Sequence, residues 1–108
     1  MISARFFYAG EHCTGCSVEG HAGYAEEGAD IVCASVSSAV QTVANLMTEI
    51  YHLPVSAEEE EKTAAIVLRL DKPDVSGNAD RLFAGLELQF QLLAEAYPAY
   101  IQLKHMEV

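Results

Sequence analysis

Hydrophobic and polar residues alternate along several short stretches of the chain, a pattern typical of strands that bury one face. Residues 2–9 are rich in aromatic and β-branched side chains, and residues 15–19 follow them after an expected turn at residues 10–14. Residues 63–70 and 100–108 show the same alternation. The pattern therefore predicts a hairpin at the start of the chain and two later strands.

Two longer stretches repeat hydrophobic residues every three or four positions, which predicts amphipathic helices. The first begins after Asp30, a favoured N-cap because its carboxylate accepts the free amide hydrogens of the first turn, and ends near His52, ahead of Pro54. Its expected buried stripe consists of Val32, Val36, Val40, Val43, Met47 and Ile50. The second helix spans residues 79–97 and ends at Pro98. Its expected buried face consists of Leu82, Leu86, Phe90 and Leu93.

The predicted elements follow the order β-β-α-β-α-β, with a charged, solvated connection at residues 58–62. Because two amphipathic helices need one apolar sheet face to cover, we expect an α/β protein of the α+β type. The expected architecture is a two-layer sandwich with a mainly antiparallel four-stranded sheet under two helices. The length fits a single domain over residues 1–108. The other face of the sheet would stay open in a monomer, which favours a homodimer.

Acidic residues outnumber basic ones by 16 to 6, and the formal net charge is -10. Such a surface repels phosphate backbones, so we expect no direct nucleic-acid binding. The charge serves solubility in the first place, and it would also attract a basic partner.

Signals for other locations and for cofactors do not occur in the sequence. No stretch approaches the ~20 apolar residues of a membrane span, and residues 1–10 lack the pattern of a secretory signal. We therefore expect a cytoplasmic protein without membrane association, whose three cysteines are reduced thiols. No phosphate-binding glycine motif or nucleotide fingerprint occurs either, so no cofactor is expected.

Cys33 is a candidate nucleophile because of its place at the start of the first helix. With Asp30 as the N-cap, Cys33 is the third helical residue. Free backbone N–H groups and the positive end of the helix dipole should then lie close to its sulfur. These surroundings favour the thiolate, and the same N–H groups would stabilise an oxyanion. The Asp30 carboxylate works partly against this, since it disfavours a second negative charge nearby.

His21 lies on a glycine-rich loop ahead of Cys33 and is the candidate general base. A flexible loop can bring the imidazole to the helix start, where it would take the thiol proton and later protonate the leaving amine. Asp30 or Ser37 would orient the pair, and the sequence does not decide between them. The alternative is that Cys33 is a small buried hydrophobic residue and His21 an ordinary loop histidine.

The run from residue 20 to residue 37 resembles the signature of the ribosomal-processing cysteine proteases, the Prp family. Its pattern is Gly-His-Ala, one residue, Tyr, a short acidic loop, Gly, one residue, then Asp-Ile-Val-Cys-Ala, one residue, Val-Ser. The matching positions in this chain are Gly20, His21, Ala22, Tyr24, Gly28, Asp30, Ile31, Val32, Cys33, Ala34, Val36 and Ser37. The chain length and the element order also resemble the family.

The resemblance implies a His21–Cys33 catalytic dyad in a homodimeric α/β protein. It also implies a substrate: the N-terminal extension of a large-subunit ribosomal protein, which is removed before ribosome assembly. In the family this extension is apolar and carries consecutive aromatic residues at the cleavage site. The loop that closes on this peptide would include Gly20, Ala22, Gly23, Tyr24 and Gly28.

One feature departs from the family pattern: Cys13 and Cys16 form a Cys-x-x-Cys pair in the predicted hairpin. The simplest interpretation is two ordinary thiols. A second is a thiol–disulfide pair, and a disulfide between Cys16 and Cys33 would silence the protease. A third is a zinc-binding protein in which Cys13, Cys16, His21 and Cys33 are the four ligands.

A further alternative to the protease is a binding module without catalysis. Such a module would dock on ribosomal proteins or on assembly intermediates. Its binding would not depend on the Cys33 sulfur, whereas proteolysis would.

Overall fold

The computed structural model describes residues 1–26 and 29–108, and its helices and strands lie close to those that the hydrophobic pattern predicts. In chain order the elements are β1 (Ile2–Ala9), β2 (His12–Glu19), α1 (Ile31–Asn45), the π-helical turn η1 (Leu46–Ile50), β3 (Val55–Glu60), β4 (Ala65–Leu70), α2 (Asn78–Ala96) and β5 (Ile101–Glu107).

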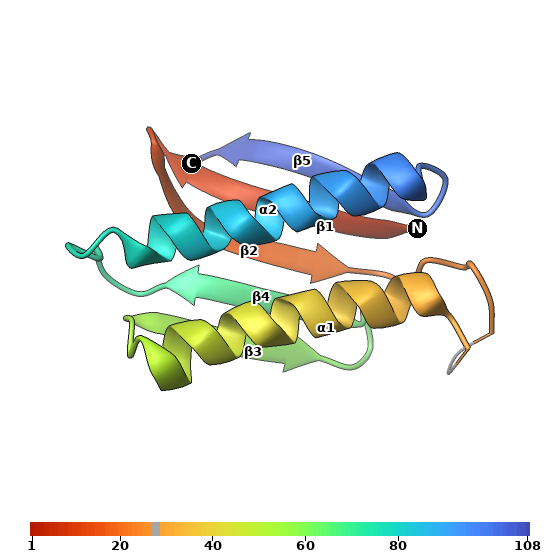
Figure 1. Ribbon diagram of the computed structural model, residues 1–108, viewed down its shortest axis with the longest axis horizontal. Coiled ribbons are helices and arrows are strands. Elements are labelled where there is room, and N and C mark those ends of the chain that lie inside the picture. The colour runs from red at the N-terminus through yellow and green to blue at the C-terminus, as the bar shows by residue number, and fades with distance from the viewer. Residues whose placement is uncertain (27–28) are drawn as a thin grey trace.

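The strands of the described residues form one five-stranded mixed sheet in the order β3-β4-β2-β1-β5. Neighbouring strands are antiparallel except β1 and β5, which run parallel. Helices α1 and α2 lie side by side over one face of this sheet (Figure 1). The α+β class and the two-layer arrangement are therefore confirmed, but the predicted four-stranded sheet is wrong by one strand.

The additional strand is β3, which includes part of the segment 58–62 that we expected to be a solvated connection. Val55 is buried opposite Leu70, and the Glu58 carboxylate lies 3.5 Å from the guanidinium of Arg69 on β4. The glutamates make this strand difficult to predict from the sequence, because Glu is depleted in strands. Charged residues nevertheless suit an edge strand, since they oppose pairing with another sheet.

The hydrophobic core lies between the helices and the sheet. In α1, Val32, Val36 and Val40 are buried, as their spacing predicts. In α2, Phe90 packs edge-on against Phe6 of β1, with the ring centroids 5.9 Å apart. The buried valines hold α1 against the core, with its N-terminal end next to residues 20–26.

The first helix ends in η1, where the Tyr51 N–H donates to the Leu46 carbonyl oxygen five residues back, at 2.8 Å. A π-helical turn is wider than an α-helical turn, so it rotates the side chains that follow it. Met47 is buried as predicted, but Ile50 is 66% exposed and does not belong to the buried stripe.

By length and composition alone, the helical segment Ile31–Ile50 is long and apolar enough to cross a membrane, so the expectation that no stretch approaches such a span is wrong. The core helix of a soluble protein meets the same criterion, and in this fold the segment packs its valines against the sheet. The absence of membrane association therefore stays a prediction.

Candidate active site

The start of α1 is built on Asp30. Its carboxylate oxygen Oδ1 accepts the backbone N–H groups of Val32 and Cys33, each at 3.0 Å, and the Ala34 N–H donates to the Asp30 carbonyl oxygen. Asp30 is therefore the N-cap and Cys33 is the third helical residue, both as predicted. The expectation of free amides beside the sulfur is wrong for Val32 and Cys33, because Asp30 already accepts both.

The second carboxylate oxygen of Asp30 holds the loop that precedes the helix. Oδ2 accepts the N–H groups of Tyr24 at 3.0 Å and Ala25 at 3.4 Å. The pKa of the Asp30 carboxyl is lowered, first by the Cys33 N–H and then by those of Ala25, Tyr24 and Val32, while burial opposes the shift. One ionised carboxylate thus joins the loop to the helix start.

The sulfur of Cys33 accepts a hydrogen bond from the loop. The Ala22 N–H donates to Cys33 Sγ at 3.2 Å, and Ala22 itself is only 4% exposed. A backbone N–H directed at sulfur stabilises negative charge there, as thiolate chemistry requires. The donor beside the sulfur therefore comes from the loop, eleven residues away in sequence, and not from the helix.

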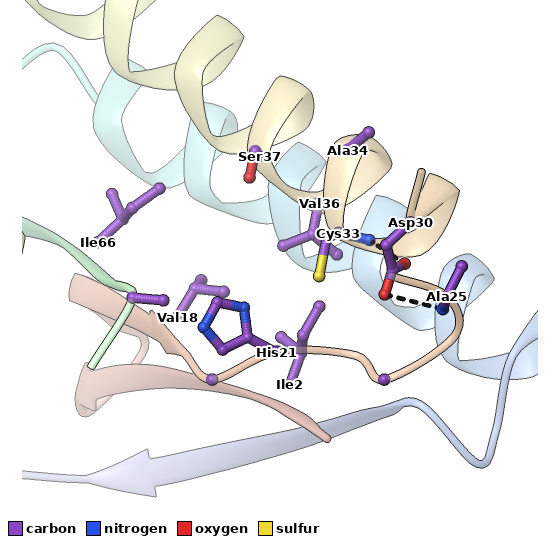
Figure 2. A pocket seen from close by; sticks show the side chains of 13 residues that line it. Ile2, Val18, His21, Ala25, Asp30, Cys33, Ala34, Val36, Ser37 and Ile66 are labelled. Carbon is purple, nitrogen blue, oxygen red and sulfur yellow. Dashed lines mark hydrogen bonds between the residues drawn. The ribbon is translucent and has the colours of Figure 1, made fainter. Parts of the chain in front are cut away.

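Cys33 and His21 line the same pocket, which has a volume of about 450 Å³. Figure 2 shows the Cys33 sulfur pointing from the helix toward the loop that carries the His21 ring. His21 is exposed, whereas Cys33 is partly buried. Ser37 lines the pocket one helical turn beyond Cys33. The structure thus brings together the predicted nucleophile, the predicted base and Ser37.

The predicted substrate loop is anchored at its first residue. Gly20 has φ +93°, and its N–H donates to the Thr63 carbonyl oxygen at 3.2 Å. A Cβ at Gly20 would lie 2.6 Å from the Met1 carbonyl oxygen, so no other residue fits here without a shift of the backbone. Gly23 also has a positive φ, of 73°. Gly28, which we also assigned to this loop, lies outside the described residues.

Part of the pocket wall comes from segments that sequence reasoning missed. Ala64, in the turn between β3 and β4, lines the pocket. Ile66 of β4, Ile2 and Val18 line it as well (Figure 2). Ala64 has φ 51°, a left-handed conformation that is uncommon for alanine. These residues have no signal in the sequence, because only the pairing of β2 with β4 brings them to the loop.

Cys13 and Cys16 lie elsewhere, inside the core. Three residues apart on a regular strand, they would face opposite sides. The register between β1 and β2 shifts after Cys13, so Thr14 is an extra residue and both cysteines are buried. Burial raises the pKa of Cys13 to about 11 and that of Cys16 to about 12.

The zinc alternative is not supported by this arrangement. Over residues 1–26 and 29–108, no group of three or more His, Cys, Asp or Glu side chains is placed to hold a metal ion. Cys13, Cys16 and Cys33 are free thiols, and His21 is exposed on its loop. The four proposed ligands therefore do not form a site.

The pocket, with a thiol at a helix start and an imidazole beside it, is consistent with covalent catalysis by cysteine. The profile of a family described as cysteine protease Prp matches residues 1–102. The protein is therefore a cysteine protease. It belongs to the Prp family, as the signature between residues 20 and 37 predicts.

Solved structures share this fold over nearly the whole chain. The crystal structure of SMU.848 from Streptococcus mutans is 28% identical, with a TM-score of 0.86, and covers 100% of this chain and 96% of that chain. The ribosomal processing protease Prp from S. aureus with a covalently linked product peptide is 22% identical, with a TM-score of 0.87 and coverage of 97% and 99%. Its complex with a substrate peptide is 21% identical, with a TM-score of 0.82 and the same coverage. No curated protein matches the chain in sequence.

Proposed function

We propose that this protease is an endopeptidase that removes the N-terminal extension of a large-subunit ribosomal protein, with Cys33 as nucleophile and His21 as general base. The observation that carries the proposal is the shared pocket. The Cys33 sulfur accepts the Ala22 N–H and points to the side of the pocket on which His21 lies (Figure 2). A nucleophile and a base in one cavity are the minimum that cysteine proteolysis requires.

The proposed reaction proceeds in two stages. His21 accepts the thiol proton of Cys33, and the sulfur attacks the carbonyl carbon of the scissile bond. When the tetrahedral intermediate collapses, the C–N bond breaks and the protonated His21 gives its proton to the leaving amine. Water, deprotonated by His21, then hydrolyses the thioester and restores the free thiol.

The Ala22 N–H is the proposed donor to the oxyanion that forms in each stage. It already lies 3.2 Å from the sulfur to which the reacting carbon must bond, whereas Asp30 accepts the N–H groups of Val32 and Cys33. Asp30 in turn fixes the loop through Tyr24 and Ala25 rather than through the imidazole. We therefore assign Asp30 to positioning the loop, and Ser37 to contacting the bound peptide.

The proposed substrate rests on the family and on charge. The similar S. aureus protein is a ribosomal processing protease that has been crystallised with a substrate peptide and with a product peptide. The net charge of -10 suits a basic ribosomal protein, because opposite charges speed encounter.

We also propose that the protein works as a cytoplasmic homodimer. Among the described residues, no helix covers the second face of the sheet, which leaves room for another copy (Figure 1). Light scattering in solution is expected to give twice the 11.7 kDa mass of one chain. A mass of one chain at micromolar concentration would contradict the dimer.

The test of the activity is cleavage of a peptide that copies the N-terminal extension of the ribosomal protein from the same organism, followed by mass spectrometry. The native enzyme is expected to make a single cut, and Cys33→Ser none. Cys13→Ser is the matched control, because it also changes a thiol to a hydroxyl but lies outside the pocket, and it should cut like the native enzyme.

Persistent cutting by Cys33→Ser in clean protein would remove Cys33 from the mechanism. If the native enzyme does not cut but binds the peptide as tightly as Cys33→Ser does, the non-catalytic binding module becomes the better account.

A further inference from the structure

The active-site loop, residues 20–26, contacts a distant part of the chain through one aromatic side chain. The Tyr24 ring meets the Tyr97 ring edge-on, with centroids 5.7 Å apart and an interplanar angle of 83°. It meets the Tyr100 ring in the same way, at 5.2 Å and 75°. Edge-to-face geometry at these distances is the favoured arrangement for aromatic pairs. Tyr24 therefore rests on a platform of two rings.

This platform lies in the connection between α2 and β5, which hydrogen bonds join to α2 and to β1. Tyr97 follows the last turn of α2, where its N–H donates to the Leu93 carbonyl oxygen at 2.8 Å. The Tyr100 carbonyl oxygen accepts the N–H of Ile2, which begins β1 and lines the pocket. Both rings are partly buried against the core. Figure 1 shows the connection between α2 and β5 at the same end of the molecule as the loop.

The loop, in contrast, has few attachments of its own between its ends. Tyr24 is 43% exposed, and the neighbouring Gly23 has a positive φ, with nothing within 4 Å of the place where a Cβ would lie. Its other attachments are the burial of Ala22 in the core and the hydrogen bonds of Gly20 to Thr63, of Ala22 to the sulfur, and of Tyr24 and Ala25 to Asp30. The two ring contacts therefore add a side-chain attachment at Tyr24 to these backbone hydrogen bonds.

We propose that Tyr97 and Tyr100 are positioning residues, which hold the loop through Tyr24 and so keep His21 and the Ala22 N–H beside the Cys33 sulfur. The link to catalysis rests on the proposed function. Neither ring lines the pocket, so the two tyrosines act through the loop and not on the substrate. Each ring contact raises the equilibrium constant for the loop position seen here by roughly a factor of two to ten.

The test compares two double variants of the full chain, Tyr97→Leu with Tyr100→Leu, and Tyr97→Phe with Tyr100→Phe. Leucine keeps the packing against the core but removes the aromatic edge contact, whereas phenylalanine keeps both. Tyr51→Leu is the control, because Tyr51 is an exposed tyrosine at the end of η1, outside the pocket.

The first readout is residue-resolved hydrogen exchange without peptide. In the leucine pair, the amides of Ala22, Tyr24 and Ala25 should exchange about tenfold faster than in the native enzyme. The amides of Val32 and Cys33 are an internal control, since they bond to the same Asp30 carboxylate from the helix and should not change. The phenylalanine pair and Tyr51→Leu should match the native enzyme.

The second readout is peptide cleavage, where the leucine pair should lower kcat by about threefold to tenfold and leave KM nearly unchanged. Unchanged exchange in the loop, or equal acceleration in the loop and in the helix, would overturn the proposal. So would a phenylalanine pair that behaves like the leucine pair. If the native enzyme cuts no peptide, the proposed function fails, and so does the catalytic part of this inference. The exchange data would still show separately whether the rings hold the loop.

Discussion

Cys33 and the pair Cys13 and Cys16 are free thiols in the same small protein, yet their surroundings are opposite. Cys33 is partly exposed in a pocket, with a backbone N–H at its sulfur and a histidine on the adjoining loop. Cys13 and Cys16 are 2% and 0% exposed in the core, and burial raises the pKa of both thiols.

The comparison teaches that a cysteine acquires chemistry from its position in the fold and not from a short motif. The Cys-x-x-Cys spacing draws attention in the sequence, but the extra residue Thr14 turns both sulfurs into the core. A lone cysteine at a helix start is less conspicuous. The loop that supplies the Ala22 N–H and His21 makes it the candidate nucleophile.

The largest expected effect comes from removing His21, the candidate general base beside Cys33. His21→Ala should lower kcat for the peptide by roughly 10²–10⁴-fold, because it removes the proposed carrier of the thiol proton. The Asp30 carboxylate in the same pocket already accepts four backbone N–H groups. His12→Ala is the control, since His12 pairs with Asp80 outside the pocket, with 2.7 Å between Nδ1 and Oδ2. Loss of less than threefold in His21→Ala would remove His21 from the mechanism.

The next largest effect is the difference in alkylation rate between Cys33 and the two buried thiols. In the folded protein, iodoacetamide should modify Cys33 at least about a hundredfold faster than Cys13 or Cys16, because a thiol must be both accessible and deprotonated to react. Peptide mapping after timed quenching gives the three rates. After unfolding in urea the rates should converge, and equal rates in the folded protein would contradict the comparison.

The Asp30 carboxylate joins the loop to the start of α1, so removing its charge should have a smaller but measurable effect on kcat. Asp30→Asn should lower kcat by about tenfold, because one neutral amide oxygen cannot hold both the loop and the helix amides as a carboxylate does. Asp74→Asn is the matched control. Asp74 accepts the Ala79 N–H at the start of α2, far from the pocket, and its pKa is also lowered.

The pH dependence of stability follows from the same carboxylate. The pKa of Asp30 is lower in the folded chain than its ordinary value of 3.8. Its ionised form therefore stabilises the fold at pH values above 3.8, and this contribution is lost as the pH falls through the lower folded-state pKa. The stability difference between native protein and Asp30→Asn, measured by urea unfolding, should shrink between pH 5 and pH 2. A constant difference would contradict this role of the charge.

The smallest expected effect is on stability and concerns Cys16, one of the two cysteines buried in the core. Cys16→Ser should lower the free energy of unfolding by about 1–3 kcal/mol, because it buries a hydroxyl group among apolar side chains. The same substitution at Cys33 should change stability little. Cys16→Ser should keep its cleavage activity, and a loss of kcat without a loss of stability would show that Cys16 takes part in the reaction.

Much of the fold could be predicted from residue patterns, because local periodicity reports directly on burial. The hairpin strands, both helices and the Asp30 cap follow from spacing within a few residues. The acidic edge strand β3 could not be predicted, since its glutamates point to a loop. Nor could the parallel pairing of β1 with β5, which depends on contacts about a hundred residues apart.

In the candidate site, too, features that depend on neighbouring residues could be predicted, and features that depend on long-range packing could not. Cys33 is a candidate nucleophile because of its sequence separation from Asp30, and His21 is a candidate base because of its glycine-rich loop and the signature around it. Sequence reasoning placed Ala22 in the loop but missed the hydrogen bond from its N–H to the sulfur. It also missed Ala64, which long-range packing brings to the pocket, and the rings of Tyr97 and Tyr100, which long-range packing brings to the loop. Only the second task of Asp30, holding Tyr24 and Ala25, involved residues close enough in sequence to be suspected.

The most direct test of the central claim is to trap the acyl-enzyme. The native enzyme is mixed with the ribosomal-extension peptide, quenched with acid within seconds, digested and mapped by mass spectrometry. We predict a thioester between the N-terminal fragment and Cys33 that disappears on longer incubation as the free fragment accumulates. Turnover of the peptide with no adduct on Cys33 at any time, or with the adduct on Cys13 or Cys16, would contradict the account.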